Sequence, residues 1–276
     1  MKPAKHINLH EPQVMAIVNV TDDSFYDGSR TMADEDILRR VQQVISQGAT
    51  IVDVGGYSSR PGADDISEQE EWMRVRRGLQ AVRAVSKDVT ISVDTFRAGV
   101  ARRALEEFGW LIINDISAGE LSPEMVDVVA EHHVPYVAMH MRGNPQIMQQ
   151  DIDYEDGVVA EVYRYFEQRV AFLQSRGVKQ IILDPGFGFA KSVEQNYQLL
   201  ASLNKFCDFG YPILAGLSRK SMIYKVLGCT PAEALAGTIA LNWEALRQGA
   251  SILRVHDVGE AAQQVQLYKK IRGLSK

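Results

Sequence analysis

Cysteine is scarce in this chain of 276 residues, which has only Cys207 and Cys229. Two thiols are too few for the disulfide framework of a small secreted domain, and neither belongs to a C-x-x-C pair. We therefore expect two buried, reduced thiols, as in a protein of the cytoplasm.

Long apolar runs and an excess of positive charge are also absent. No run approaches the ~20 apolar residues of a membrane-spanning helix, and residues 1–13 lack the apolar centre of a signal peptide. The formal net charge is −5, so the surface offers no broad attraction for nucleic acid or an anionic membrane. These absences predict a cytoplasmic protein that binds neither, and they leave room for a local basic pocket.

The chain instead shows a regular alternation of short apolar runs and longer helical patterns. The runs span 14–20, 50–56, 89–95, 111–116, 134–140, 180–186, 211–218 and 250–257. Each is apolar almost throughout, which is typical of parallel strands covered on both faces. Eight strand–helix units without a linker predict one α/β domain over 14–276, a (β/α)8 TIM barrel, after an N-terminal extension over 1–13.

Local signals predict where several helices begin. Ser67 with Glu70 and Thr230 with Glu233 have the spacing of a capping box, and Ser122 stands directly before a proline. Two loops, 19–32 and 55–66, are longer than a plain barrel requires. Long loops in compact domains usually serve as lids or binding loops.

Polar residues close every predicted strand at the same end. They are Asn19, Asp53, Asp94, Asn114, Asp115, His140, Asp184, Ser218, Arg219, Lys220, Arg254 and His256. The active site of such barrels lies at the carboxyl ends of the strands, so we expect one shared site there. Asp53 remains open between touching a ligand and orienting its neighbours, and His140 between the site and a packed strand end. Asp115 is expected to cap the following helix.

The glycine-rich stretch ILDPGFGFAK (182–191) is not a nucleotide cradle. A P-loop needs glycine directly before its lysine, and here Ala190 precedes Lys191. A dinucleotide fingerprint needs a third glycine where Lys191 stands, so both motifs fail. We expect a tight turn that brings the backbone close to a flat ligand and leaves Asp184 pointing into the barrel mouth.

The strand ends, taken together, predict a ligand with two parts. Deep groups alternate acceptors and donors, and a carboxylate such as Asp184 suits the two parallel N–H donors of a guanidine-like heterocycle edge. These deep groups are Asp94, Asn114, Asp184 and Lys220. The rim carries an anion site suited to phosphate or pyrophosphate, made by Asn19, Arg60, Arg219, Arg254 and His256.

At this point the chain resembles the dihydropteroate synthase family over about 15–260. The resemblance rests on MAIVNVTDDSFYDG, IVDVGGYSSRPGA, ISVDT, INDI, MHMRG, ILDPGFGFAK, AGLSRKS and ILRVHDV, in this order. It implies condensation of 6-hydroxymethyl-7,8-dihydropterin pyrophosphate with 4-aminobenzoate, which gives 7,8-dihydropteroate and pyrophosphate in folate biosynthesis. It also implies that sulfonamide analogues of 4-aminobenzoate target the site.

The resemblance assigns roles residue by residue. The pterin would be held by Asp94, Asn114, Met139, Asp184, Phe189, Lys220 and Arg254, and 4-aminobenzoate by Phe25, Ser59, Pro61, Arg219, Lys220 and Ser221. The groups implied to act in catalysis are Asn19, Arg60, Asp94, Asp184, Lys220, Arg254 and His256. Asn19 would help to hold a Mg²⁺ cofactor on the pyrophosphate, because Mg²⁺ keeps waters and binds few protein oxygens beside phosphate.

Several residues depart from the family pattern. Tyr57 stands where glutamate is common, Asp22 replaces a proline and Ala190 replaces a glycine. Apolar residues of the late helices exceed one buried stripe and, with the resemblance, suggest a homodimer; they are Ala234, Leu235, Ile239, Leu241 and Leu246.

Two alternative functions remain open from the sequence. A pterin-dependent methyltransferase would hold a folate in a similar pocket, but it should lack the SRKS segment (218–221) and a pyrophosphate site. A paralogue that binds pterin without catalysis is the second alternative. The anion site argues against it, because a pure binder has little need of those groups.

Overall fold

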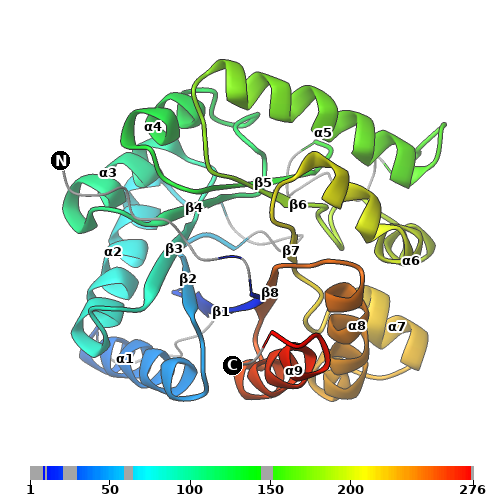
Figure 1. Cartoon of the computed structure of the whole chain (residues 1–276). Coiled ribbons are helices and arrows are strands. Elements are labelled where there is room, and N and C mark those ends of the chain that lie inside the picture. Colours follow the sequence, from blue (N-terminus) through cyan, green and yellow to red (C-terminus); the bar gives the residue numbers. More distant parts are fainter. Residues whose placement is uncertain (1–8, 10, 21–29, 59–64, 144–151, 275–276) are drawn as a thin grey trace.

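Eight parallel strands form a nearly closed barrel with helices outside it (Figure 1). The computed structural model describes residue 9 and residues 11–20, 30–58, 65–143 and 152–274. Neighbouring strands pair in the order β6-β5-β4-β3-β2-β1-β8-β7. The strands are β1 (Gln13–Asn19), β2 (Ile51–Gly55), β3 (Thr90–Asp94), β4 (Ile112–Asp115), β5 (Tyr136–Met139), β6 (Ile181–Asp184), β7 (Leu214–Ala215) and β8 (Ile252–Val255).

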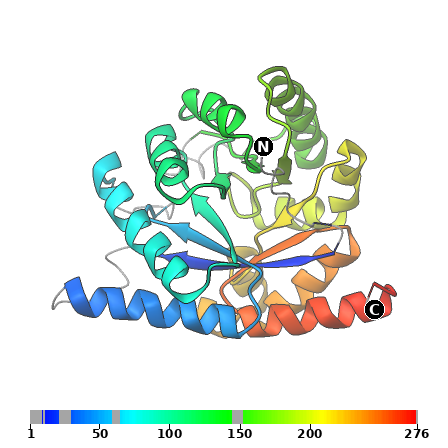
Figure 2. The ribbon, with the colours of Figure 1, turned by 60° about the vertical axis from the view of Figure 1, so that its left-hand side comes forward.

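Helical segments connect the strands and cover the outside of the barrel, as Figures 1 and 2 both show. They are α1 (Arg30–Ser46), α2 (Glu68–Val85), α3 (Ala98–Phe108), α4 (Glu124–His132), α5 (Val158–Ser175), α6 (Val193–Ala201), η2 (Leu203–Phe209), α7 (Ser221–Leu227), η3 (Pro231–Glu233), α8 (Leu235–Arg247) and α9 (Val258–Ile271). The predicted (β/α)8 TIM barrel is confirmed. Gln13 already lies in β1, and the predicted domain boundary at residue 13 stays a prediction.

Seven of the eight strands are shorter than the apolar runs that predicted them, and β1 has the same length as its run. The run over 211–218 contains only the two-residue strand β7, because the rest of it continues into turns at both ends. The barrel closes between β6 and β7 through one isolated parallel bridge, Leu183 with Ile213, and the Leu183 N–H donates to the carbonyl of Pro212.

Seven strands fill the lower part of the barrel with apolar side chains. This lower inner layer consists of Met15, Ile51, Ile112, Val137, Ile182, Leu214 and Ile252, one residue from each strand except β3. All seven are at most 2% exposed. Layers of branched side chains make the centre of such a barrel a packed core and not a pore.

A second core lies between the strands and the helices. Val14, Val52 and Val93 point outward from their strands and pack with Val41 of α1 and Leu79 of α2. Because parallel strands alternate their side chains between two covered faces, both faces must be apolar. The continuous apolar runs in the sequence follow from this double burial.

The predicted helix caps are confirmed in part. Thr230 and Glu233 form a complete capping box, but it opens the short turn η3, and α8 begins two residues later. Ser67 caps α2, yet the reciprocal bond is missing because the Glu70 carboxylate pairs with an arginine one turn further on. Ser122 makes no side-chain cap bond to α4, because its hydroxyl accepts from the start of α3.

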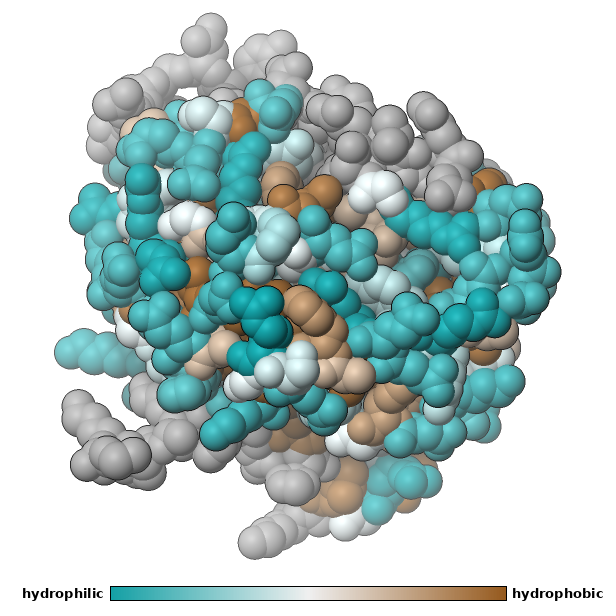
Figure 3. All heavy atoms as spheres, turned by 90° about the horizontal axis from the view of Figure 1, so that it is seen from above, coloured by the Kyte–Doolittle hydropathy of each residue, from teal (hydrophilic) through white to brown (hydrophobic). Residues whose placement is uncertain are grey.

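The coloured part of the face seen in Figure 3 is mostly hydrophilic, with small separate groups of hydrophobic residues. Among the described residues, no helix is long and apolar enough to cross a membrane. The expectation of two buried thiols is wrong: Cys207 is exposed and Cys229 is half-buried. Cys207 lies in the 3-10 segment η2 on the outside of the barrel, where its side chain stays exposed.

Candidate active site

Polar side chains stand directly above the lower inner layer. Ile51, Ile112, Ile182 and Ile252 are each followed two residues later by a polar residue of the same strand. Alternate residues of a strand face the same side, so these polar side chains enter the barrel as well. The upper polar layer comprises Asp53, Asp94, Asn114, Asp184 and Arg254 from the strands, with Lys220 from the start of α7.

Arg254 is the centre of this upper polar layer. Its Nε donates to Oδ2 of Asp53 at 2.6 Å, and its Nη2 donates to Oδ2 of Asp94 at 2.5 Å. Burial alone would lower the pKa of Arg254, but the two carboxylates outweigh it and raise the pKa. Burial raises the pKa of Asp94 to about 7, although Arg254 opposes the shift.

Asp53 orients its neighbours, which is one of the two roles that the sequence left open for it. Its Oδ2 also accepts from Nδ2 of Asn114 at 3.0 Å, and the residue is fully buried. One carboxylate oxygen therefore fixes both the Arg254 guanidinium and the Asn114 amide. Because it holds two predicted ligand groups at once, Asp53 is a positioning residue.

Asp115 has a structural role close to the one expected from the sequence. Its carboxylate accepts from the backbone N–H groups of Ser117 and Gly119 and from the Tyr136 hydroxyl. It therefore organises the turn after β4, while the helix α4 begins only at Glu124. The predicted helix cap is thus replaced by a loop anchor.

Asp184 at the end of β6 and Lys220 at the start of α7 influence each other electrostatically. Oδ1 of Asp184 accepts from the Gly186 N–H at 2.8 Å, and burial raises the pKa of Asp184 against the attraction of Lys220. The Lys220 ammonium donates to the Phe187 carbonyl and lies 4.8 Å from the centroid of the Phe189 ring. Enclosure of this ammonium lowers the pKa of Lys220 to about 8, with Asp184 opposing the shift.

An apolar wall borders the upper polar layer. It consists of Ile116, Met139, Met141 and Ala190, with Phe96 and Phe189 packed against it. Met139 is Asp184's register partner on β5. The site therefore combines a flat hydrophobic surface with a row of hydrogen-bonding groups, which is the usual construction of a pocket for a planar heterocycle.

The rim residues Asn19 and His256 lie at the ends of the paired strands β1 and β8. Asn19 is exposed, and a Cβ on Gly55 would meet both its Oδ1 at 3.4 Å and the Asp94 Cβ at 3.5 Å. His256 lies 3.1 Å through Nδ1 from the Ser218 hydroxyl. Burial and then Arg254 lower the pKa of His256 to about 4. The sequence placed His256 among groups that are or can become cationic, whereas here the ring is neutral near pH 7.

Arg219 is engaged away from the upper polar layer. Its Nε and Nη2 bind both oxygens of Asp257 at 2.9 and 2.8 Å, and its Nη1 donates to the Pro231 carbonyl at 2.8 Å. Its backbone is left-handed, with φ of 56°. Ser221, the next residue but one, is partly buried at the first position of α7.

Comparisons with known proteins decide the family. Residues 15–256 match the family model described as pterin binding enzyme. The chain is 44% identical over 259 residues to the dihydropteroate synthase of Escherichia coli (strain K12), covering 93% of this chain and 90% of that protein. It is 43% identical over 267 residues to the dihydropteroate synthase of Haemophilus influenzae, covering 96% of each.

Solved structures agree with these sequence relatives. A dihydropteroate synthase of Xanthomonas albilineans with 4-aminobenzoic acid superposes with a TM-score of 0.88 at 38% identity, covering 97% of this chain and 95% of that chain. The same enzyme in complex with 7,8-dihydropteroate gives 0.86 at 36% identity, covering 98% and 97%. This chain belongs to the dihydropteroate synthase family. Members of this family are transferases of the folate pathway.

Part of the site expected in a dihydropteroate synthase lies outside the described residues. Phe25, Ser59, Arg60 and Pro61 are in this group, as is Asp22. Their assignments stay predictions from the sequence. All four predicted deep groups belong to the upper polar layer, and Asn19 and His256 lie at its rim. The Arg219 guanidinium is bound to Asp257 instead.

Tyr57, which departs from the dihydropteroate synthase pattern, lies at the rim beside β2. Its ring meets Phe96 edge to face at 5.1 Å, and the Arg97 guanidinium lies 5.2 Å from the Tyr57 centroid. Arg97 also binds the buried carboxylate of Glu71 at 2.8 Å and Asp65 at 3.1 Å. The aromatic ring is thus accommodated by stacking and cation–π contact.

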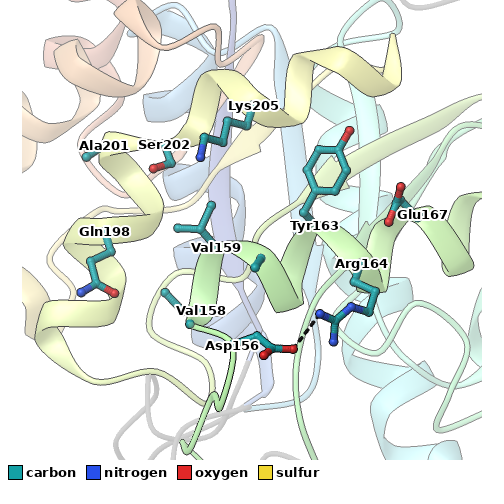
Figure 4. A pocket seen from close by; sticks show the side chains of 12 residues that line it. Asp156, Val158, Val159, Tyr163, Arg164, Glu167, Gln198, Ala201, Ser202 and Lys205 are labelled. Carbon is teal, nitrogen blue, oxygen red and sulfur yellow. Dashed lines mark hydrogen bonds and ion pairs between the residues drawn. The ribbon is translucent and has the colours of Figure 1, made fainter.

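A groove elsewhere on the chain does not compete with the barrel mouth. It has a volume of about 680 Å³ and lies outside the barrel between α5 and the α6–η2 segment (Figure 4). Asp156 and Arg164 pair at 2.7 Å on its border with both side chains exposed. None of the described residues predicted for the site lines this groove.

Two buried residues around the glycine-rich loop, Lys191 and Asn196, are not among the functional candidates from the sequence, which leaves a third, His140, undecided. Lys191, Asn196 and His140 are each at most 4% exposed. Lys191 was considered only as a P-loop lysine. Lys191 follows the loop that comes after the buried strand β6, and this position was the available signal that it contacts the site. The sequence gives no sign of the role of Asn196.

Proposed function

We propose that this chain condenses 6-hydroxymethyl-7,8-dihydropterin pyrophosphate with 4-aminobenzoate to give 7,8-dihydropteroate and pyrophosphate. The observation that carries the proposal is the upper polar layer. A buried carboxylate, Asp184, and a buried amide, Asn114, both belong to this layer, and Lys220 and Arg254 place positive charge near Asp184. The solved relative that holds 7,8-dihydropteroate on the same fold supports it.

The deep groups are suited to the pterin. The carboxylate of Asp184 can accept two parallel N–H donors from the guanidine-like edge of the ring. Burial makes the charged form of Asp184 costly in the ligand-free protein, so two donors at this position would stabilise it. Met139 and Phe189 offer flat apolar contact on the ring, and Arg254 offers its planar guanidinium for stacking.

Departure of the pyrophosphate breaks the C–O bond to the exocyclic methylene, and the leaving group keeps the electron pair. Lys220 and Arg254 would stabilise the negative charge that develops on its oxygens. His256 is neutral near pH 7 and would take part by hydrogen bonding. The electron-rich dihydropterin ring stabilises positive charge on the methylene carbon.

A magnesium ion fits the rim when the pyrophosphate supplies most of its ligands. Asn19 offers an exposed amide oxygen there, and Mg²⁺ binds through few protein oxygens beside phosphate and water. Within the described residues, no cluster of three His, Cys, Asp or Glu side chains could hold a metal. When bound, Mg²⁺ would neutralise pyrophosphate charge.

The second half of the reaction forms a C–N bond. The amine nitrogen of 4-aminobenzoate attacks the methylene carbon with its lone pair and then loses one proton to solvent or to the released pyrophosphate. The arylamine is neutral at pH 7, so no strong base is required. Predicted contacts to 4-aminobenzoate come from Lys220 and Ser221 among the described residues, with Phe25, Ser59 and Pro61; Arg219 would have to leave Asp257 to join them.

Finer properties follow from the same proposal. We expect a cytoplasmic enzyme, inhibited by sulfonamide analogues of 4-aminobenzoate, that forms a homodimer. Of the late-helix residues expected at the interface, Ala234 and Leu246 are buried in the core, which corrects that part of the prediction. Ile239 of α8 is 36% exposed, and Leu267 and Ile271 of α9 are 61% and 70% exposed, so the surface still offers apolar contacts for a second copy.

Product formation tests the proposed function directly. The purified chain is incubated with the dihydropterin pyrophosphate, 4-aminobenzoate and Mg²⁺, and dihydropteroate is followed by chromatography. We expect dihydropteroate and pyrophosphate in equal amounts. Pterin binding by calorimetry without product would identify the non-catalytic paralogue, whereas methyl transfer from a methylated folate would identify the methyltransferase.

A further inference from the structure

The loop that follows β6, residues 186–190, is held by side chains at nearly every turn of its backbone. The Gly188 N–H donates to Oδ1 of Asn196 at 2.7 Å, and the Ala190 carbonyl accepts from the Tyr154 hydroxyl at 2.9 Å. Ala190 has φ of 51°, a conformation that costs an alanine energy. A loop bound in this way is a rigid wall and not a free turn.

Lys191 contributes the largest number of these bonds. Its Nζ lies 3.0 Å from the Gly186 carbonyl, 2.9 Å from the Phe189 carbonyl and 3.0 Å from Nδ1 of His140. The side chain is 4% exposed. An ammonium group has three N–H donors, and the three acceptors use all of them. The lysine thus ties both ends of the loop to the end of β5.

His140 completes the clamp from the neighbouring strand. Burial, followed by the charges of Lys191 and Arg142, keeps the pKa of His140 well below its usual value, so Nδ1 of the neutral ring can accept. The Tyr165 ring packs edge to face against it at 4.9 Å. The backbone N–H of His140 also donates to the backbone carbonyl of Asp184 at 2.9 Å. His140 is therefore fixed to the two strands that carry Met139 and Asp184.

The clamp tolerates loss of the lysine proton. Burial lowers the pKa of Lys191 to about 7, with Asp184 raising it and Lys220 lowering it. A neutral amine still donates to the two carbonyls and can accept from Nδ1–H of the other His140 tautomer. Both protonation states thus keep the same three contacts.

The clamped loop contacts the predicted pterin groups directly. Its Phe187 carbonyl binds the Lys220 ammonium, and its Phe189 ring lies under the same ammonium. Gly186 leaves no room for a side chain, because an added Cβ would lie 2.0 Å from the His140 carbonyl oxygen. A shift of the loop would therefore displace Lys220 and the apolar wall together.

We propose that Lys191 and His140 are positioning residues for the pterin substrate, which hold the loop 186–190 so that Phe189 and Lys220 meet the ring. The hydrogen bonds of the Lys191 ammonium go to the loop and to His140, and its charge acts on Asp184 through space. Both positioning residues act through the loop, and the inference rests on the proposed function because it specifies how the same pterin pocket is built. Small displacements of binding groups have large effects on binding and rate.

The substitution Lys191→Met tests the clamp, because methionine fills similar space and cannot donate. We expect the Kd for a non-reactive dihydropterin, measured by calorimetry, and the KM for the pterin pyrophosphate to rise by about tenfold or more. The KM for 4-aminobenzoate should change by less than about threefold. Lys205→Met, the same change at an exposed lysine of η2, is the matched control and should alter neither.

A purely structural role gives a different result. It would lower the fraction of folded protein, counted by ligand titration, and leave the pterin Kd of the folded fraction unchanged; that result would overturn the proposal. Wild-type product formation is measured alongside, so that absence of product there counts against the proposed function and not against the clamp.

Two substitutions of His140 provide the second test if Lys191→Met does not fold. Asparagine can place an acceptor oxygen near the position of Nδ1, whereas leucine cannot. We expect His140→Asn to keep the pterin Kd within about threefold of wild type and His140→Leu to raise it about tenfold. Equal effects of the two substitutions would contradict the proposal.

Discussion

The lower inner layer and the upper polar layer are built on the same strands, two residues apart, yet they have opposite properties. In β6, Ile182 packs among apolar neighbours, while Asp184 is a buried carboxylate with a raised pKa. In β8, Ile252 and Arg254 repeat the contrast. The strand backbone is the same in both layers, so the difference lies wholly in the side chains.

The difference teaches how one barrel separates stability from binding. Apolar side chains below are satisfied by each other and need no ligand. Above them, burial disfavours the charged forms of Asp94 and Asp184 and of Lys220, as the directions of their pKa shifts show. Such groups contribute little net stability, and under the proposed function the hydrogen-bonding capacity that they do not use within the protein would serve the ligand.

The largest expected effect on activity comes from a substitution in the upper polar layer, at Asp184. Asp184→Asn keeps an oxygen for the Gly186 N–H but replaces the second acceptor with a donor. A site that loses the partner of a buried N–H donor discriminates strongly, so we expect kcat/KM for the pterin pyrophosphate to fall by about 10³-fold or more. Steady-state kinetics measure this.

The stability of Asp184→Asn should move less than that of a core cavity variant, because relief of the cost of burying the carboxylate offsets the lost attraction to Lys220. Its free energy of unfolding, from urea denaturation, is expected within about 1 kcal/mol of wild type. A loss of several kcal/mol would show that the upper layer supports the fold as strongly as the lower layer does, and would remove the contrast between them.

The next largest expected effect is on stability and comes from a substitution in the lower inner layer, at Ile182 of the same strand. Ile182→Ala leaves a cavity in a packed core, so we expect the free energy of unfolding to fall by about 2–5 kcal/mol. At a temperature where the variant remains folded, kcat/KM per folded molecule should stay within about threefold of wild type. A loss of activity as large as that of Asp184→Asn would contradict the separation of the layers.

The sequence predicted the fold because the covered parallel strands impose their pattern on every run. Eight continuous apolar runs left only a barrel of eight units, and the polar residue at each strand end marked the mouth. Boundaries were less well predicted. β7 has two residues where the run has eight. Apolar residues of turns that are buried under helices give the same sequence pattern as a buried strand.

The sequence named residues that the structure brings together in the upper polar layer, but not how they pair. Asp94, Asn114, Asp184, Lys220 and Arg254 were all named, but sequence does not say that Arg254 bridges two carboxylates. Those bonds join residues far apart in the chain, and their geometry follows from the stagger of the strands. The neutral state of His256 likewise depends on burial and on Arg254, neither of which can be read from the residue alone.

The smallest expected effect concerns pH and the Lys220 ammonium. Burial lowers the pKa of Lys220 in the folded chain to about 8, below its value near 10.4 in an unfolded chain. The folded chain therefore releases this proton first as the pH rises. Holding the proton costs stability below about pH 8, and that cost is relieved progressively between about pH 8 and pH 10.4.

Activity should respond in the opposite direction to stability. Above about pH 8 the free enzyme loses the charge that faces the pterin and its pyrophosphate, so kcat/KM should fall about tenfold per pH unit. Lys220→Arg keeps a charge at all these pH values. The fall of its kcat/KM should therefore begin at a higher pH than in the wild type, even if its maximum kcat/KM is lower. Substrate ionisation affects both enzymes equally. If kcat/KM falls at the same pH in the wild type and in Lys220→Arg, the ionisation belongs to the substrate and not to Lys220.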